Sequence, residues 1–148
     1  MNVMDEILDF AIAREQEAVD FYLGMVESTS NVQMKKIFEV YASEEKVHKE
    51  KLQGIKSSGI ISSNFKEIEN LNIANYVFAS VETAEMTYQD ALIIAMKREE
   101  AAYQLYKDLA DKANTADLQT LFKSLAQEEA KHKLRFEREY DQYILTEN

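Results

Sequence analysis

Apolar residues recur at steps of three and four residues along almost the whole chain, which is the periodicity of an amphipathic α-helix. The 148 residues include no proline and only three glycines, so few positions interrupt a helix. We therefore expect an all-α fold. A chain of this length that is 46% hydrophobic suits one domain with one core, spanning residues 1–148.

Polar breaks divide this pattern into four long helices, expected over about 4–29, 32–57, 88–113 and 116–143. Ser28–Asn31 form the first break and supply N-cap residues, while Asn114 and Thr115 form the last. Both breaks are short, so each pair of helices should be an antiparallel hairpin. The expected hairpins cover residues 4–57 and 88–143.

Residues 58–87 lack so clear a pattern and should form the connection between the hairpins. Gly59 marks the end of the preceding helix, and a short helix is expected over Ile73–Ser80. Thr87 followed by Asp90 resembles a capping box at the start of the third long helix. A link of about 30 residues is too long for a tight turn. It can instead cross the length of an antiparallel four-helix bundle.

The sequence repeats after 84 residues, so that the second hairpin aligns with the first without a gap. This predicts a pseudo-twofold bundle of two equivalent hairpins. Shared core packing can explain the apolar matches, whereas the charged matches need another reason. The identical pairs are Leu8/Leu92, Ala11/Ala95, Arg14/Arg98, Glu15/Glu99, Ala18/Ala102, Tyr22/Tyr106, Phe38/Phe122, Ala42/Ala126, Glu44/Glu128, Glu45/Glu129, His48/His132 and Lys49/Lys133.

Six ionisable residues lie on the apolar stripes of the four helices. On the first and third helices, one glutamate lies among the apolar residues of the inward face. On the second and fourth helices, a Glu-x-x-His pair lies there. Residues three apart share one face of a helix, so each pair can present an oxygen and a nitrogen together. The six residues are Glu15, Glu45, His48, Glu99, Glu129 and His132.

Four carboxylates buried together would cost several kcal/mol for each ion without compensation. Two divalent cations would balance them, and mixed carboxylate and imidazole ligation suits iron or manganese, with zinc as a further option. One Glu from each of two helices, plus one Glu-x-x-His from each of the others, is the ligand set of di-iron carboxylate bundles. The alternative is that His48 and His132 are surface histidines paired with Glu45 and Glu129, in a bundle that holds no metal.

Two repeated tyrosines and two repeated glutamates lie near the predicted site. Tyr22 and Tyr106 follow Glu15 and Glu99 by two helical turns; their rings should fill the core, and each hydroxyl needs a partner. A ligand carboxylate is a candidate partner, so both tyrosines are candidate catalytic residues. Glu44 and Glu128 lie one step off the stripe and are expected to be solvated or in salt bridges.

Charge and composition exclude several classes of function. The net charge of −10 disfavours binding to nucleic acid or to anionic membranes. The absence of cysteine excludes disulfides and iron–sulfur clusters. The chain shows neither a signal peptide nor an apolar run of the roughly 20 residues that cross a bilayer. A cytoplasmic protein is expected.

Four segments resemble the four helices of the ferritin-like superfamily, particularly stand-alone rubrerythrin-type di-iron proteins. This resemblance implies that Glu45 and Glu129 bridge the metals, that Glu15 and Glu99 are terminal ligands, and that each metal has one histidine. The segments are Ala13–Tyr22 (AREQEAVDFY), Tyr41–Leu52 (YASEEKVHKEKL), Ala95–Tyr106 (AMKREEAAYQLY) and Leu125–Phe136 (LAQEEAKHKLRF).

The chain also departs from the rubrerythrin pattern. Rubrerythrins proper carry a cysteine-rich rubredoxin domain, so here a separate protein must donate electrons. Rubrerythrins tend to have an extra glutamate on the third helix and an asymmetric ligand set, whereas here Met96 precedes Glu99 and both halves offer a histidine. That symmetry is more similar to the ferroxidase centre of bacterioferritin. Bacterioferritin binds haem through a methionine where this chain has Lys46, so no haem is expected.

The resemblance implies redox chemistry at two iron ions, with hydrogen peroxide or dioxygen as the small oxidant. A rubrerythrin-like peroxidase is the favoured reading. A ferroxidase that stores or delivers iron is the first alternative, and it would need a shell-forming oligomer. A di-iron oxygenase acting on an organic substrate is the second. The sequence leaves open whether the protein forms a homodimer.

Overall fold

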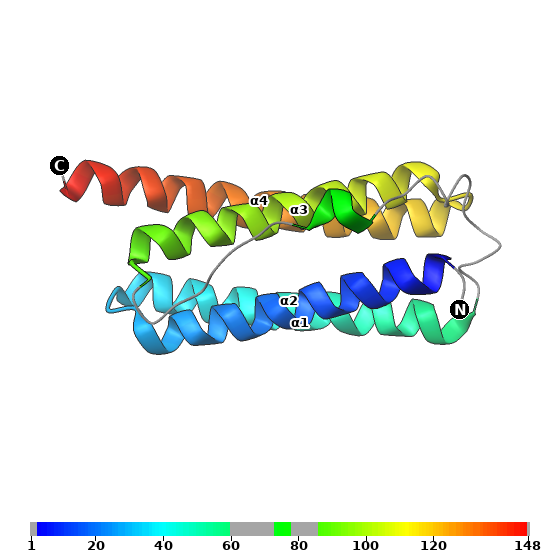
Figure 1. Cartoon of the computed structure of the whole chain (residues 1–148), viewed down its shortest axis with the longest axis horizontal. Coiled ribbons are helices and arrows are strands. Elements are labelled where there is room, and N and C mark those ends of the chain that lie inside the picture. The colour runs from blue at the N-terminus through cyan, green and yellow to red at the C-terminus, as the bar shows by residue number, and fades with distance from the viewer. Residues whose placement is uncertain (1–2, 60–72, 78–85, 148) are drawn as a thin grey trace. The chain divides into compact units, whose positions relative to one another are not determined.

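The computed structural model describes residues 3–59, 73–77 and 86–147 of the chain. Four α-helices lie in this part, α1 (Val3–Ser28), α2 (Val32–Ser58), α3 (Tyr88–Lys112) and α4 (Ala116–Glu147), with a short 3₁₀ helix, η3 (Ile73–Tyr76) (Figure 1). The helices expected from the sequence therefore all form, and α4 runs four residues further than its expected end at 143. The expected helix over Ile73–Ser80 is present as η3 at its start, and residues 78–80 lie outside the described residues.

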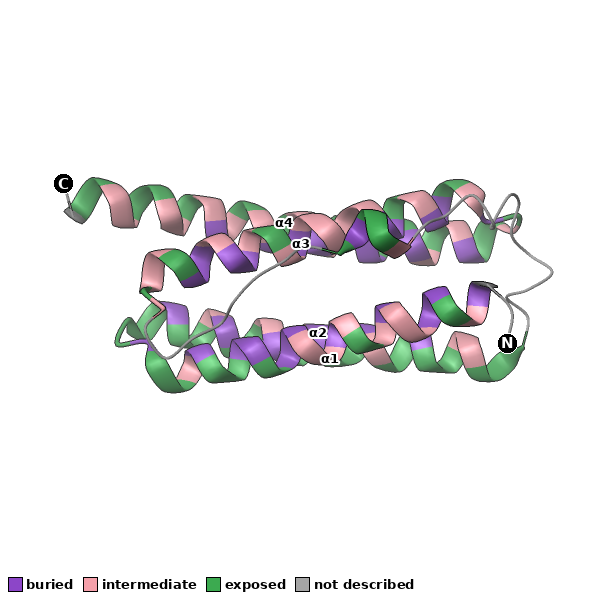
Figure 2. Cartoon of the chain, viewed as in Figure 1, coloured by how far each residue is buried: buried purple, intermediate pink, exposed green. Residues whose placement is uncertain are grey.

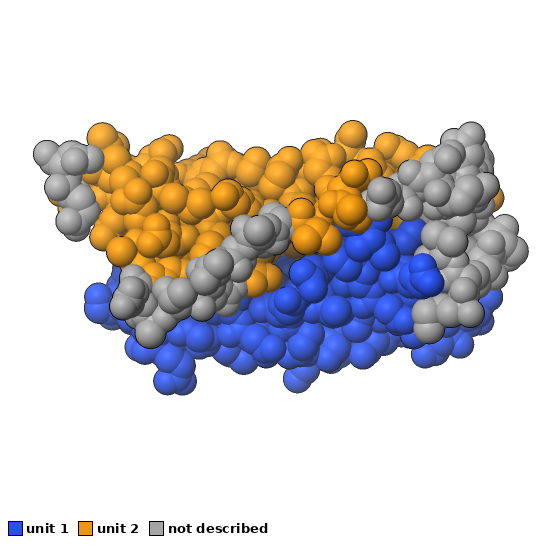
Figure 3. All heavy atoms as spheres, in the orientation of Figure 1, with its two compact units in different colours: residues 1–73 blue, residues 74–148 orange. Residues whose placement is uncertain are grey.

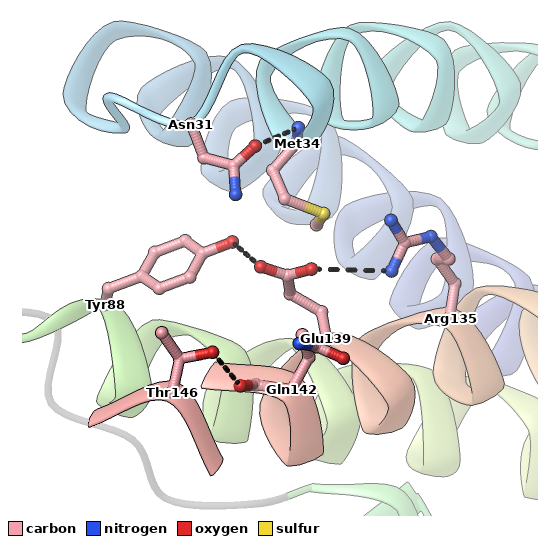
Figure 4. A network of polar contacts seen from close by, with 7 residues as sticks. All are labelled: Asn31, Met34, Tyr88, Arg135, Glu139, Gln142 and Thr146. Carbon is pink, nitrogen blue, oxygen red and sulfur yellow. Dashed lines mark hydrogen bonds and ion pairs between the residues drawn. The ribbon is translucent and has the colours of Figure 1, made fainter. Parts of the chain in front are cut away.

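Side chains at the breaks satisfy the helix ends as the sequence predicts. Asn31 caps α2 by accepting a hydrogen bond from the backbone N–H of Met34 (3.0 Å), as Figure 4 shows. Thr87 and Asp90 form a reciprocal capping box at the start of α3. Gly59 ends α2 in the left-handed conformation (φ 71°), which glycine adopts without a steric penalty.

The chain divides into two compact units, residues 1–73 and 74–148 (Figure 3). The first contains the antiparallel hairpin of α1 and α2, and the second contains η3 with the antiparallel hairpin of α3 and α4 (Figure 1). We call these hairpin one and hairpin two. Most of the expected connection over 58–87 lies outside the described residues.

Each hairpin buries one face of each of its helices (Figure 2). In α1 the residues Leu8, Ala11 and Tyr22 are buried, together with Phe21 and Met25. In hairpin two the buried residues include Leu92, Ala95 and Tyr106 of α3 and Phe122 and Phe136 of α4. Within the described ranges, no helix combines the length and the apolar character that spanning a bilayer requires.

Candidate metal centre

Three of the six predicted ligands come together in hairpin one. Glu15 comes from α1, and Glu45 and His48 come from successive turns of α2; all three are at most 2% exposed. Each offers a ligand atom within 4.8 Å of the others. His48 Nδ1 lies 3.4 Å from Glu45 Oε1 and 3.7 Å from Glu15 Oε2. We call this group triad one.

Hairpin two repeats the arrangement with its own three residues. Glu99 comes from α3, and Glu129 and His132 come from α4; all three are at most 2% exposed. Their ligand atoms also lie within 4.8 Å of one another, and His132 Nδ1 is 3.5 Å from Glu99 Oε1. We call this group triad two. The structure thus brings the six predicted ligands together as two buried groups of three.

Burial makes the charged form of these carboxyls costly. It raises the pKa of the Glu15 carboxyl well above its usual range; the charge of Glu45 adds to the rise, and the interaction with His48 opposes it. A buried pair of carboxyls beside an imidazole therefore holds protons readily when no cation is present. A divalent cation among them would displace those protons and restore both charges.

The donor set of each triad fits a transition-metal ion. Two carboxylates and one imidazole are the ligand types that iron, manganese and zinc accept. Donor atoms bound to one such ion at about 2.1 Å lie roughly 3 to 4 Å apart. The oxygen–nitrogen distances of 3.4, 3.5 and 3.7 Å in the two triads match that separation.

The predicted tyrosines occupy equivalent places in the cores of the two hairpins. Tyr22 is fully buried and stacks on Phe38, with ring centroids 6.0 Å apart and an interplanar angle of 24°. Tyr106 stacks on Phe122 in nearly the same way, at 6.3 Å and 25°. Both rings fill the core as expected. The hydrogen bond predicted between each hydroxyl and a ligand carboxylate stays a prediction.

Each hairpin also has a polar contact beside its triad that the sequence did not predict. In hairpin one, Lys49 donates to Gln16 Oε1 (2.6 Å), which joins the residue after His48 to the residue after Glu15. In hairpin two, Lys133 pairs with Glu100 Oε2 (3.0 Å) at the equivalent positions. Each contact joins the two helices of its hairpin one residue beyond a candidate glutamate ligand and a candidate histidine ligand. The identity of Lys49 and Lys133 in the repeat was the signal for it.

A second polar network distinguishes the end of hairpin two at which α3 begins and α4 ends (Figure 4). The Tyr88 hydroxyl donates to Glu139 Oε2 (3.1 Å), and Arg135 pairs with Glu139 Oε1 (3.6 Å). The Tyr143 ring packs edge-on against Tyr88, at 5.3 Å between centroids. Hairpin one has Met4 at the position equivalent to Tyr88, so the repeat gave no indication of this network.

Comparisons with known proteins agree with this architecture. The family model described as Rubrerythrin matches residues 6–140. A hypothetical protein from Pyrococcus furiosus has a similar structure, with a TM-score of 0.74 and 25% sequence identity over 95% of this chain and 89% of that one. No match was found among curated proteins. The expected all-α, ferritin-like helical bundle is confirmed.

Proposed function

This chain belongs to the rubrerythrin family, and we propose that it is a di-iron oxidoreductase that reduces hydrogen peroxide with electrons from a separate protein. Members of the family typically bind a di-iron centre, which agrees with the metal-binding groups described above. The observation that carries the proposal is the pair of buried triads, each with two carboxyls and one imidazole within 4.8 Å.

The six residues would together hold two iron ions. The carboxylates of Glu15, Glu45, Glu99 and Glu129 and the imidazoles of His48 and His132 would hold them. Four carboxylates carry the charge that two divalent ions balance, so loading removes the cost of burying these groups. Two ferrous ions would supply the two electrons that reduce hydrogen peroxide to water.

The residues around the ligands would exclude bulk water and keep the ligands in place. The six candidate ligand residues are at most 2% exposed, so the oxidant would react away from bulk solvent. The contacts Lys49–Gln16 and Lys133–Glu100 fix the helix register on which the ligand positions depend. Tyr22 and Tyr106 would each present a hydroxyl to a ligand carboxylate, and a proton at either hydroxyl oxygen could move to the reacting oxidant.

Electron supply is assigned to a separate donor protein, because the chain contains no cysteine. Cysteine ligands are what an iron–sulfur cluster or a rubredoxin-type iron site would need within the same chain. We therefore propose that the electrons come from a separate redox protein.

Rapid mixing of the iron-loaded, reduced protein with each oxidant tests this function. Absorbance of the oxidised iron should rise faster with hydrogen peroxide than with dioxygen at equal concentration. The Glu45→Ala and Glu129→Ala variants should lose the reaction, and Glu44→Ala serves as the matched control one position away. A faster reaction with dioxygen would contradict the peroxidase assignment but would not contradict the assignment of the metal ligands.

The symmetry of the ligands favours one second candidate, a ferroxidase that stores or delivers iron. Both hairpins offer the same Glu, Glu and His, which resembles the bacterioferritin centre more than the asymmetric rubrerythrin one. Storage needs a closed shell of many subunits. A monomer or dimer in sedimentation would exclude storage, and a 24-subunit assembly would favour it over the peroxidase.

A further inference from the structure

Tyr22 of hairpin one contacts a second tyrosine as well as Phe38. The rings of Tyr22 and Tyr41 meet edge to face, with centroids 6.3 Å apart and an interplanar angle of 65°. This is an ordinary contact distance for a pair of aromatic rings. Tyr22 is fully buried, whereas Tyr41 is half-buried and has part of its surface in water. The contact therefore joins a tyrosine inside the core to one at the surface of the hairpin.

The two tyrosines follow the candidate ligands in a definite order. Tyr22 comes two turns after Glu15 in α1, and helical side chains lean toward the N-terminus of their helix, so its ring leans back toward Glu15. Tyr41 comes one turn before Glu45 in α2, so its ring leans away from Glu45. From the core outward, the order is therefore triad one, Tyr22 and then Tyr41.

Packing alone does not explain a tyrosine at position 41. The 84-residue repeat puts Leu125 at the equivalent position of hairpin two, where it is fully buried. The stacked tyrosine and phenylalanine beside this position are nearly the same in the two hairpins. An aliphatic residue therefore meets the packing requirement, and the phenol of Tyr41 serves another purpose.

We propose that Tyr22 and Tyr41 carry a one-electron oxidising equivalent from the candidate metal centre to the surface of hairpin one. The inference rests on the proposed function, because peroxide reduction is what brings a strong oxidant to triad one. A phenol can lose one electron together with its proton and become a phenoxyl radical. The aliphatic side chain of Leu125 cannot, so the equivalent position of hairpin two does not extend the same route.

The tyrosine pair acts when hydrogen peroxide meets a centre that holds a single ferrous ion. Reduction of hydrogen peroxide to two water molecules takes two electrons, and two protons from solvent, but only one electron is then available from metal. Tyr22 supplies the second electron and passes its proton to a ligand carboxylate, the predicted partner of its hydroxyl. Tyr41 then gives an electron to Tyr22, which takes its proton back, and Tyr41 releases its own proton to water. A small reductant in solution, such as ascorbate, restores Tyr41 with one electron and one proton.

This route protects the ligands. One-electron reduction of hydrogen peroxide breaks its O–O bond into hydroxide and a hydroxyl radical, which attacks neighbouring side chains. The second electron completes the reduction to water and leaves the unpaired electron on Tyr41, where a reductant in solution reaches it. Such a reductant does not reach Tyr22, because that ring is fully buried.

Spin trapping followed by peptide mass spectrometry tests the route. Protein loaded with one ferrous ion per chain is mixed with hydrogen peroxide and a nitroso spin trap, and the wild type should carry the adduct on Tyr41. Tyr22→Phe should lose that adduct, because it keeps the ring that stacks on Phe38 but cannot form a phenoxyl radical. Tyr106→Phe is the matched control, since it removes the equivalent buried hydroxyl of hairpin two, and it should keep the adduct on Tyr41.

The lifetime of the radical provides a second readout. Electron paramagnetic resonance of samples frozen at successive times, with ascorbate present, follows the tyrosyl signal. Tyr41→Leu should prolong this signal, because the radical then stays on the buried ring of Tyr22. Leucine occupies the equivalent position of hairpin two, so this variant should keep its fold, which far-ultraviolet circular dichroism checks.

An adduct on Tyr41 that survives Tyr22→Phe would mean that the oxidant attacks the surface directly, and it would overturn the inference. Equal loss of the adduct in Tyr106→Phe, or an unchanged radical lifetime in Tyr41→Leu, would also overturn it. Iron content and the rate of iron oxidation by hydrogen peroxide are measured on the same samples. If both are as expected while the radical tests fail, the proposed function stands without the tyrosine route; a chain that takes up no iron would overturn both.

Discussion

Glu45 of hairpin one and Glu129 of hairpin two lie at equivalent positions, and both are 1% exposed. Two residues further on, Val47 and Lys131 are also equivalent and both are exposed, but one is apolar and the other is charged. The same contrast runs along both hairpins. The candidate ligands, the stacked aromatic rings and the lysines beside the histidines are repeated, and much of the outer surface is not. The repeated residues belong to the cores and to the candidate metal ligands, whereas the outer surfaces of the two hairpins differ.

Replacing the repeated carboxyls should have the largest effect. Glu45→Ala and Glu129→Ala should each abolish binding of two metal ions, because either change removes a predicted bridging ligand. Metal analysis after dialysis measures this. Glu44→Ala and Glu128→Ala are the matched controls, since each is half-buried and adjacent to a ligand, and they should keep both ions. Full metal content in both ligand variants would refute the ligand assignment.

The stacked aromatic pairs allow a direct comparison of the two cores. Phe38→Ala and Phe122→Ala should each lower the free energy of unfolding by about 3–5 kcal/mol, because each leaves a cavity at a fully buried site. The two costs should agree within about 1 kcal/mol, since the stacking geometries match. Urea denaturation measures both, with the exposed Leu134→Ala as control. Costs that differ severalfold would mean that the two cores are not equivalent.

Asn31 and Thr115 lie at equivalent positions before α2 and α4, so their variants test whether two different residues stabilise a helix start equally. Asn31 accepts a hydrogen bond from the Met34 N–H (3.0 Å), and Thr115 accepts one from the Leu118 N–H (3.2 Å). Asn31→Ala and Thr115→Ala should each cost about 1 kcal/mol of stability. Thermal unfolding measures the loss, and Asn31→Asp should restore it. No loss in either alanine variant would show that these hydrogen bonds contribute nothing.

The Tyr88 network should have an effect of similar size to that of one cap, confined to hairpin two. Tyr88→Phe removes the hydrogen bond to Glu139 and should cost about 1 kcal/mol. Burial raises the pKa of Tyr88 above its ordinary value of 10.0, with the charge of Glu139 adding to the rise. The group therefore stabilises the fold below pH 10.0 and loses that contribution as the pH rises further. Stability measured against pH should fall there in the wild type and less in the variant; parallel curves would contradict this.

The sequence predicted the parts of the fold that depend on local periodicity and capping. The bounds of the helices followed from the breaks at Asn31, Gly59 and Thr115, because these residues satisfy helix ends locally. The burial of Glu15 and Glu99 followed from their place on the apolar stripes. Both features can be predicted because the spacing of apolar residues along a helix determines which of its faces packs inward.

Features that depend on contacts between helices were missed. The packing of the Tyr143 ring on Tyr88 joins two residues that are 55 positions apart, and the periodicity of one helix does not predict such a contact. Phe21 and Met25 are buried beside the row formed by Leu8, Ala11 and Tyr22, because the face of a helix that packs inward is wider than a single row of residues.

Iron analysis of freshly purified protein tests the central claim most directly. Protein expressed in iron-supplemented medium and purified without chelator should contain about two iron ions per chain, as the six-ligand set implies. Removal of the iron should leave a protein that takes up two divalent ions again. Fewer than about one metal ion per two chains, of any kind, would contradict a dinuclear centre built from the two triads.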